Sequence, residues 1–117
     1  MSDLPTTAYK VLTADQMAAL QADGRLAGAP VDIADGYIHL STASQLTQTV
    51  DKHFGGQSDL HVAAVDLAAL GQTVRWEESR GGQLFPHIYG DLPLDAVVAY
   101  SPLERLDDGS VRLPVAG

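Results

Sequence analysis

Residues 60–67 read LHVAAVDL, and this almost unbroken apolar run constrains the fold more than any other segment. Such a run predicts a strand covered on both faces, because a strand with one solvated face alternates apolar and polar residues. The other predicted strands lie at 7–12, 37–40, 74–78, 85–90 and 96–101. The chain lacks the alternating strand–helix order and the glycine fingerprint of a dinucleotide-binding fold, so we predict an α+β fold with a mixed or antiparallel sheet.

Two helices are predicted in the N-terminal half of the chain, each at a capping-box pattern. Thr13 is followed three residues later by Gln16, and this pair predicts a helix over 14–23. Thr42 and Gln45 repeat the spacing, and the apolar residues after them mark a helical face that runs to the next pair of glycines.

The connections are predicted from their turn-forming residues. Residues 24–35 contain two glycines and a proline without clear periodicity, which predicts a long loop, either a functional lid or a surface connection. Residues 91–95 are predicted to form a turn. The C-terminal segment 101–117 is predicted to be a hairpin and tail, and Asp108-Gly109 favours a type I′ turn within it.

Length and composition indicate a single domain over 1–117. The chain contains no cysteine, which excludes disulfides, thiolate zinc sites and a cysteine nucleophile. No apolar run approaches the roughly 18 residues of a membrane span. The first ten residues lack the basic and apolar regions of a signal peptide. We therefore expect a soluble, cytoplasmic protein that does not bind a membrane.

The charge of the chain argues against binding to long nucleic acids. The net charge is −8, with fifteen acidic side chains against seven basic ones, and the basic residues are scattered singly. Affinity for nucleic acid comes mainly from clustered cations that displace phosphate counterions, and such a cluster is missing here. A small anion held by one or two arginines is still compatible with the sequence.

Two common designs of catalytic site find no support in the sequence. The histidines do not show the HxH or HxxxH spacing of a metal site, and no carboxylate is placed among them as a ligand, so we expect no metal. Ser41 lacks the glycine elbow that exposes the nucleophile of a serine hydrolase. The candidate chemistry must therefore come from other residues.

Two segments, GYIHLST and FPHIYG, share the pattern aromatic–x–His–x–hydroxyl. Because side chains alternate along a strand, the aromatic, histidine and hydroxyl residues of each segment lie on one face. If both faces meet in one cleft, they suit a ligand with a flat ring and sugar hydroxyls, since aromatics stack on the ring and imidazole bonds hydroxyls. The alternative is an aromatic-rich core with hydrogen-bonded histidines. The two faces consist of Tyr37, His39 and Ser41 in one strand and Phe85, His87 and Tyr89 in the other.

The helix after Ser41 and Thr42 is a second candidate feature. Its free backbone N–H groups and positive dipole end are predicted to lie beside His39, where they could receive a phosphate or carboxylate. The alternative is ordinary N-capping by a hydroxyl residue, which most helices show.

The segment WEESRGG (76–82) is a third candidate. Glu77 or Glu78 near a sugar could stabilise an oxocarbenium-like transition state or act as a base. Arg80, followed by two glycines, could clamp an anion. The alternative is that these charged side chains are simply solvated.

GYIHLSTASQL, VRWEE and FPHIYGDLPLDAVV, in this order and spacing, resemble a family of small bacterial proteins catalogued as domain of unknown function 952. The resemblance covers about residues 8–100 and includes the early AYKVL strand and the LHVAAVDL strand. The family's fold is similar to that of ADP-ribosyltransferases, in which two small packed sheets grip NAD in a central cleft. HLST also resembles the HLS element of RNA 2′-phosphotransferases, which share that fold and use NAD.

The resemblance implies roles for particular residues. His39 would bond the nicotinamide ribose, and Tyr89 or Tyr37 would stack on the nicotinamide. Glu77 or Glu78 would stabilise the oxocarbenium-like transition state. NAD would then be a substrate, whereas the arginine set of an RNA 2′-phosphotransferase is not evident.

Three functions follow from these observations. The first is binding of NAD or a related nucleotide through His39, Ser41, Thr42, His87 and Tyr89, with ADP-ribosyl transfer or related ribosyl chemistry as the reaction. The second is a non-catalytic module that binds a small metabolite in the same cleft. The third is an interaction protein whose histidines are structural. The sequence leaves open whether the chain is an enzyme.

Overall fold

The computed structural model describes residues 4–114, apart from the side chain of Arg80. Three α-helices lie in the N-terminal half of the described chain: α1 (Ala14–Asp23), α2 (Pro30–Asp35) and α3 (Ala43–His53). The strands in chain order are β1 (Thr7–Thr13), β2 (Arg25–Leu26), β3 (Ile38–His39), β4 (Leu60–Asp66), β5 (Val74–Glu78), β6 (Leu84–Ile88), β7 (Leu92–Pro93) and β8 (Val97–Pro102). None of the helices formed by the described residues is long and apolar enough to cross a membrane.

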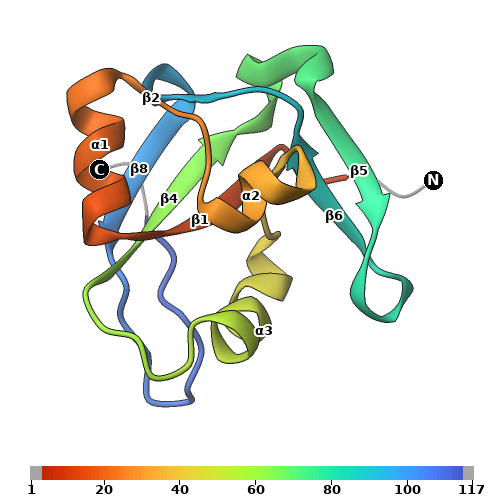
Figure 1. Cartoon of the computed structure of the whole chain (residues 1–117). Helices are drawn as coiled ribbons and strands as arrows, with labels where there is room; N and C mark the ends of the chain where they lie inside the picture. Colours follow the sequence, from red (N-terminus) through yellow and green to blue (C-terminus); the bar gives the residue numbers. More distant parts are fainter. Residues whose placement is uncertain (1–3, 115–117) are drawn as a thin grey trace.

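The strands form two three-stranded antiparallel sheets and one two-stranded sheet (Figure 1). The first sheet has the order β1-β4-β8 and the second the order β3-β6-β5, while β2 pairs with β7. The chain just after β3 joins the two larger sheets, because Ser41 pairs with Tyr9 of β1 through reciprocal hydrogen bonds of 2.7 and 2.9 Å. The prediction of an α+β fold with antiparallel pairing is therefore confirmed.

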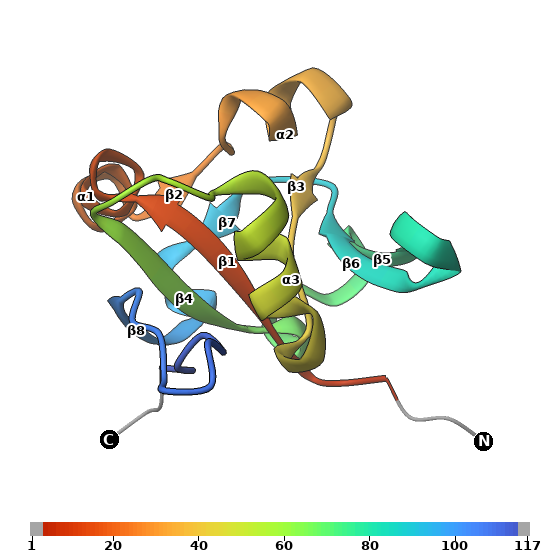
Figure 2. The ribbon, with the colours of Figure 1, turned by 90° about the horizontal axis from the view of Figure 1, so that it is seen from below.

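Strand β4 is covered on both faces, as its apolar sequence predicts. Ala63 and Val65 belong to the larger core, which includes residues of α1 and of the β3-β6-β5 sheet. Leu60 and Val62 face the opposite way and pack with Leu46 of α3 and its neighbours. Figure 2 shows α3 lying alongside β1 and β4, separate from α1 and α2.

The prediction of a long loop over 24–35 is wrong, because β2 and α2 occupy much of this segment. Pro30 is the first residue of α2, and Gly36 ends the helix with a left-handed φ of 89°. Proline suits the first helical position and glycine the position after the last, so each helix end has a local cause. Six residues are too few to show an apolar stripe, which is why periodicity misses this helix.

Three further expectations are corrected. The described chain has three α-helices in its N-terminal half and three sheets, where two helices were predicted and the family resemblance implied two sheets. The predicted turn over 91–95 contains β7, which pairs with β2. The Asp108-Gly109 turn is not of type I′, since Asp108 does not share the positive φ of Gly109. Leu106 N–H donates to Ser110 O at 2.8 Å, which closes a three-residue loop ending in glycine.

Candidate functional site

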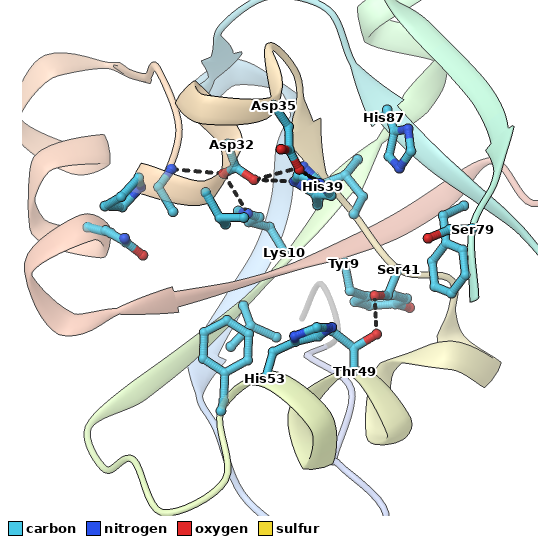
Figure 3. A pocket seen from close by; sticks show the side chains of 18 of the residues that line it. Tyr9, Lys10, Asp32, Asp35, His39, Ser41, Thr49, His53, Ser79 and His87 are labelled. Atoms are coloured by element: carbon cyan, nitrogen blue, oxygen red, sulfur yellow. Dashed lines mark hydrogen bonds and ion pairs between the residues drawn. The ribbon is translucent and has the colours of Figure 1, made fainter.

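Strands β3 and β6 place His39 and His87 opposite each other at the edge of a cavity of about 600 Å³. Their imidazole centroids are 5.3 Å apart, with the ring planes at 67°. The cavity is also lined by residues of β1, α2 and α3 (Figure 3). The two histidine segments singled out in the sequence therefore meet at one cavity.

The aromatic residues of the two segments form a platform beside this cavity, consisting of Tyr37, His87 and Tyr89. The Tyr37 ring stacks on His87, with centroids 4.2 Å apart and an interplanar angle of 26°. Tyr89 lies 5.2 Å from Tyr37, and the Arg75 guanidinium carbon lies 5.0 Å from the Tyr89 ring centroid. The pairing of β5 with β6 explains this grouping, because Arg75 is in register with His87.

His39 is held by a carboxylate that is buried in the molecule. Asp32 Oδ1 accepts from His39 Nδ1 at 2.6 Å and from the His39 backbone N–H at 3.1 Å. Its other oxygen, Oδ2, accepts from Lys10 Nζ and from the Ala29 backbone N–H, both at 2.8 Å. All four donors converge on one side chain, so the buried carboxylate of Asp32 is fully satisfied.

Burial and pairing oppose each other in this network. Burial disfavours the charged form of Asp32, but the hydrogen bond from His39 and the Lys10 ammonium outweigh it and hold the pKa of Asp32 well below its usual range. For Lys10 the balance is reversed, because burial lowers its pKa and the attraction of Asp32 offsets this only in part. We take the pair as ionised, since the 2.8 Å contact satisfies both charges.

The second ring nitrogen of His39 also faces a carboxylate. Its Nε2 lies 3.0 Å from Asp35 Oδ2, one turn further along α2 from Asp32, and this contact is partly exposed. Asp32 already requires a proton on Nδ1, and an ionised Asp35 has only lone pairs to offer. The arrangement therefore suits a His39 ring that donates hydrogen bonds from both nitrogens. Its Nε2 faces Asp35, which also lines the cavity.

His87 is held by a different carboxylate, which comes from β5. Glu77 Oε1 accepts from His87 Nδ1 at 2.8 Å and from the Tyr89 hydroxyl at 2.8 Å. These two hydrogen bonds lower the pKa of Glu77, and the same contact raises the pKa of Tyr89 because it stabilises the protonated phenol. Glu78 lies on the opposite face of the strand, with Trp76. Of the two candidate carboxylates, only Glu77 therefore lies on the histidine face.

Known proteins match this chain over most of its length. The sequence profile of a family described as "Protein of unknown function (DUF952)" matches residues 11–100. The chain belongs to this family. No curated protein is significantly similar to it.

Solved structures of one other protein share the fold. The crystal structure of protein CC0527 from Caulobacter crescentus is 41% identical, covers 92% of this chain and 94% of its own, and superposes with a TM-score of 0.84. A double mutant of CC0527 gives 39% identity, the same coverage and a TM-score of 0.83. The solution NMR structure of CC0527 gives 42% identity, 91% coverage of each chain and a TM-score of 0.77.

The remaining predicted site residues of this DUF952 chain lie in several places. Ser41 lines the cavity, and its Oγ is 2.8 Å from Thr49 Oγ1 of α3. Thr42 does not line it, and its backbone N–H donates to Gln45 Oε1 at 3.0 Å. The start of α3 is thus turned away from the cavity, which is lined instead by residues nearer the end of that helix. The side chain of Arg80 lies outside the described part of the chain.

Sequence reasoning missed Lys10, Asp32 and Asp35. Lys10 sits between Ala8 and Leu12 on the core-facing side of β1, and a lysine at such a position signals a buried counter-ion. Asp32 is the third residue of a helix that begins with proline, which is a favourable place for an acidic side chain. Within residues 4–114, no three histidine or acidic side chains are arranged to hold a metal ion.

Proposed function

We propose that this cavity binds the nicotinamide-ribose half of NAD, or of a related nucleotide. The observation that carries the proposal is the pair of histidines, His39 and His87, which line one cavity with the Tyr37 ring stacked beside them. Ring stacking and imidazole hydrogen bonds are what a flat heterocycle joined to a sugar requires. The sequence resemblance to proteins with an ADP-ribosyltransferase-like fold supports the same ligand.

Each half of the ligand has a matching part of the site. His39 Nε2, now facing Asp35, would donate to a ribose hydroxyl that takes the place of the Asp35 carboxylate. The nicotinamide ring would lie against the exposed edge of the aromatic platform, at Tyr37 or Tyr89. Asp35 is nearly half exposed, so it can turn away when the hydroxyl arrives.

The aromatic platform favours a cationic ring. In the cavity itself, Asp32 and Asp35 are balanced by the Lys10 ammonium and by the His39 ring that donates from both nitrogens, so the tyrosine faces carry this preference. The oxidised nicotinamide ring is positively charged, and it is attracted both by carboxylates and by the face of a tyrosine. The pyrophosphate would lie outside the cavity, where Arg75 approaches the Tyr89 ring.

The reaction consistent with this arrangement is ribosyl transfer. The bond between C1′ of the ribose and the nicotinamide nitrogen breaks, and the nitrogen keeps the electron pair. A water or hydroxyl oxygen then forms the new bond to C1′. The negative charge of Glu77, on the histidine face, would stabilise the oxocarbenium-like transition state between these events.

A non-catalytic binding module is the second candidate, and one observation favours it. Glu77 does not line the cavity, and its Oε1 already accepts from His87 and Tyr89. A carboxylate occupied in this way orients its neighbours but has little direct access to a ligand. The same cavity would then hold the nucleotide without cleaving it.

Two measurements test the proposal. A thermal-shift assay with NAD should show stabilisation, which is roughly 2.7 kcal/mol when the ligand is present at a hundred times its dissociation constant. Release of free nicotinamide from NAD, followed by chromatography, distinguishes the enzyme from the binding module. The variant His39→Ala should lose the NAD-induced shift, whereas His61→Ala, on β4 and outside the cavity lining, should keep it. An unchanged NAD response in His39→Ala would contradict the proposed site.

A further inference from the structure

His87 is fixed in place on several sides. It is 4% exposed and lines the cavity from β6. Tyr37 stacks on its ring, and the His39 ring lies edge-on at 5.3 Å. Glu77 and Arg75 approach from β5, and Tyr89 follows on its own strand. The ring therefore has little freedom to rotate, and its two nitrogens face fixed surroundings.

The proton on the His87 ring can be assigned from its contact with Glu77. The hydrogen bonds from His87 and Tyr89 keep the pKa of Glu77 low, so its carboxylate is ionised at neutral pH and has no proton to give. The 2.8 Å contact then requires a proton on Nδ1 of His87. In a neutral imidazole the other nitrogen, Nε2, consequently carries a lone pair.

That lone pair has no hydrogen-bond donor within the described protein. Among residues 4–114, leaving aside the side chain of Arg80, the His87 ring makes one hydrogen bond, and it uses Nδ1. Buried polar atoms are nearly always hydrogen-bonded, so a buried acceptor beside a cavity indicates that the partner comes from the cavity. His39 differs from His87 in this respect, because its Nε2 faces the Asp35 carboxylate and is suited to donate a hydrogen bond.

We propose that Nε2 of His87 is the proton acceptor of the cavity, held in that state by Glu77. This inference rests on the proposed ribosyl transfer for its reaction, although the acceptor state itself does not. As the water or hydroxyl oxygen bonds to C1′ and nicotinamide leaves with its electron pair, the O–H proton moves to His87 Nε2. The imidazolium that results is stabilised by the Glu77 carboxylate. In this proton transfer His87 is the catalytic base, and Glu77 is the positioning residue that keeps the ring proton on Nδ1.

The acceptor state is tested without any ligand. In ¹⁵N-labelled protein at neutral pH, NMR of the ring nitrogens should show His87 protonated at Nδ1 and bare at Nε2. Glu77→Ala should move the proton toward Nε2, whereas Glu78→Ala, on the opposite face of β5, should leave it unchanged. A wild-type ring protonated at Nε2 would overturn the assignment.

The base role is tested by kinetics with NAD and water as the acceptor. His87→Ala should slow nicotinamide release by about 10²- to 10⁴-fold, the usual contribution of general acid–base catalysis. Free imidazole in the buffer should restore part of the rate, because it replaces the missing base; a merely structural role would not be rescued. Glu77→Ala provides a second variant in case His87→Ala does not fold. The Glu77 side chain is partly exposed, so removing it leaves the packing of the core unchanged.

The outcomes separate this inference from the proposed function. If NAD is cleaved and His87→Ala cleaves it equally fast, the base role is wrong while ribosyl transfer stands. If NAD is not cleaved by the wild type, the proposed reaction and the base role both fail, and the NMR measurement still decides whether His87 is an acceptor.

Discussion

The two carboxylate–histidine pairs of the site are built in opposite ways. In the Asp32–His39 pair the carboxylate side chain is 0% exposed and the imidazole 34% exposed. In the Glu77–His87 pair the imidazole side chain is 5% exposed and the carboxylate 38% exposed. In the first pair a buried carboxylate therefore holds a partly exposed imidazole. In the second pair a partly exposed carboxylate holds a buried imidazole.

Because of this difference, the two carboxylates have different roles, one in the stability of the fold and the other in the protonation of the site. Asp32 lies at the contact between β1, α2 and β3, where its carboxylate accepts from Lys10 and from the backbone N–H groups of Ala29 and His39. Among the described side chains, those of His87 and Tyr89 donate hydrogen bonds to Glu77, whose own side chain is 38% exposed. Changes at Asp32 should therefore affect stability, and changes at Glu77 should affect the protonation of its neighbours.

The largest effect is expected for Asp32→Ala. Removing this carboxylate leaves the Lys10 ammonium buried without its partner, and breaking a buried ion pair in this way costs about 3–5 kcal/mol. The free energy of unfolding in urea measures the loss. Asp35→Ala is the matched control on the same helix, where an exposed ion pair should contribute within about 1 kcal/mol. Equal losses in the two variants would contradict the role of Asp32 as the anchor.

Acid should weaken the fold through the same residue. The pKa of Asp32 in the folded protein lies below its unfolded value of about 3.9, so its stabilising contribution is complete well above that pH and declines as the pH falls below it. Urea unfolding at a series of acidic pH values measures the slope. Asp32→Asn should flatten the dependence, whereas Glu78→Gln should leave it close to that of the wild type.

A smaller, local effect is expected at Tyr89. Its pKa is raised mainly by the hydrogen bond to the Glu77 carboxylate, so Glu77→Gln, which leaves only an uncharged acceptor, should bring the pKa part of the way back toward about 10. An NMR titration of the Tyr89 ring carbon measures it directly. Tyr100, whose hydroxyl accepts from Gln21 at 2.8 Å, serves as the internal control, and its ring signal should be the same in both proteins.

The smallest effect is expected in the stability of the Glu77→Gln variant. The carboxylate is exposed and screened by solvent, and the glutamine oxygen can still accept from Tyr89, so the unfolding midpoint should stay within experimental error of the wild type. A loss comparable to that of Asp32→Ala would show that both pairs are structural anchors, and the contrast between them would disappear.

Sequence patterns predict the regular part of this fold well. The capping pair Thr13 and Gln16 marks the start of α1, and the bounds 14–23 agree with the structure. The apolar run 60–67 correctly predicts a strand covered on both faces. These elements succeed because their signals are local and span a full helix face or strand.

The anchor of the site was not predictable in the same way. Helix α2 has six residues, and its flanking Pro30 and Gly36 are more conspicuous as loop formers than as helix ends. Asp32 gains its role from Lys10, which is 22 positions away in the chain and meets it only after the strands have packed. The sequence also leaves open whether Glu77 or Glu78 is the candidate carboxylate, and only the pairing of β5 with β6 puts Glu77 on the side of His87.

The most direct test of the central claim is a titration of NAD into ¹⁵N-labelled protein, followed through the ring signals of the histidines. We expect the signals of His39 and His87 to shift together along one saturation curve, because both rings line the same cavity. His61, which lies outside the cavity lining, should not move. If neither His39 nor His87 responds, or if the two follow different curves, the claim that the two histidines form a single nucleotide site is wrong.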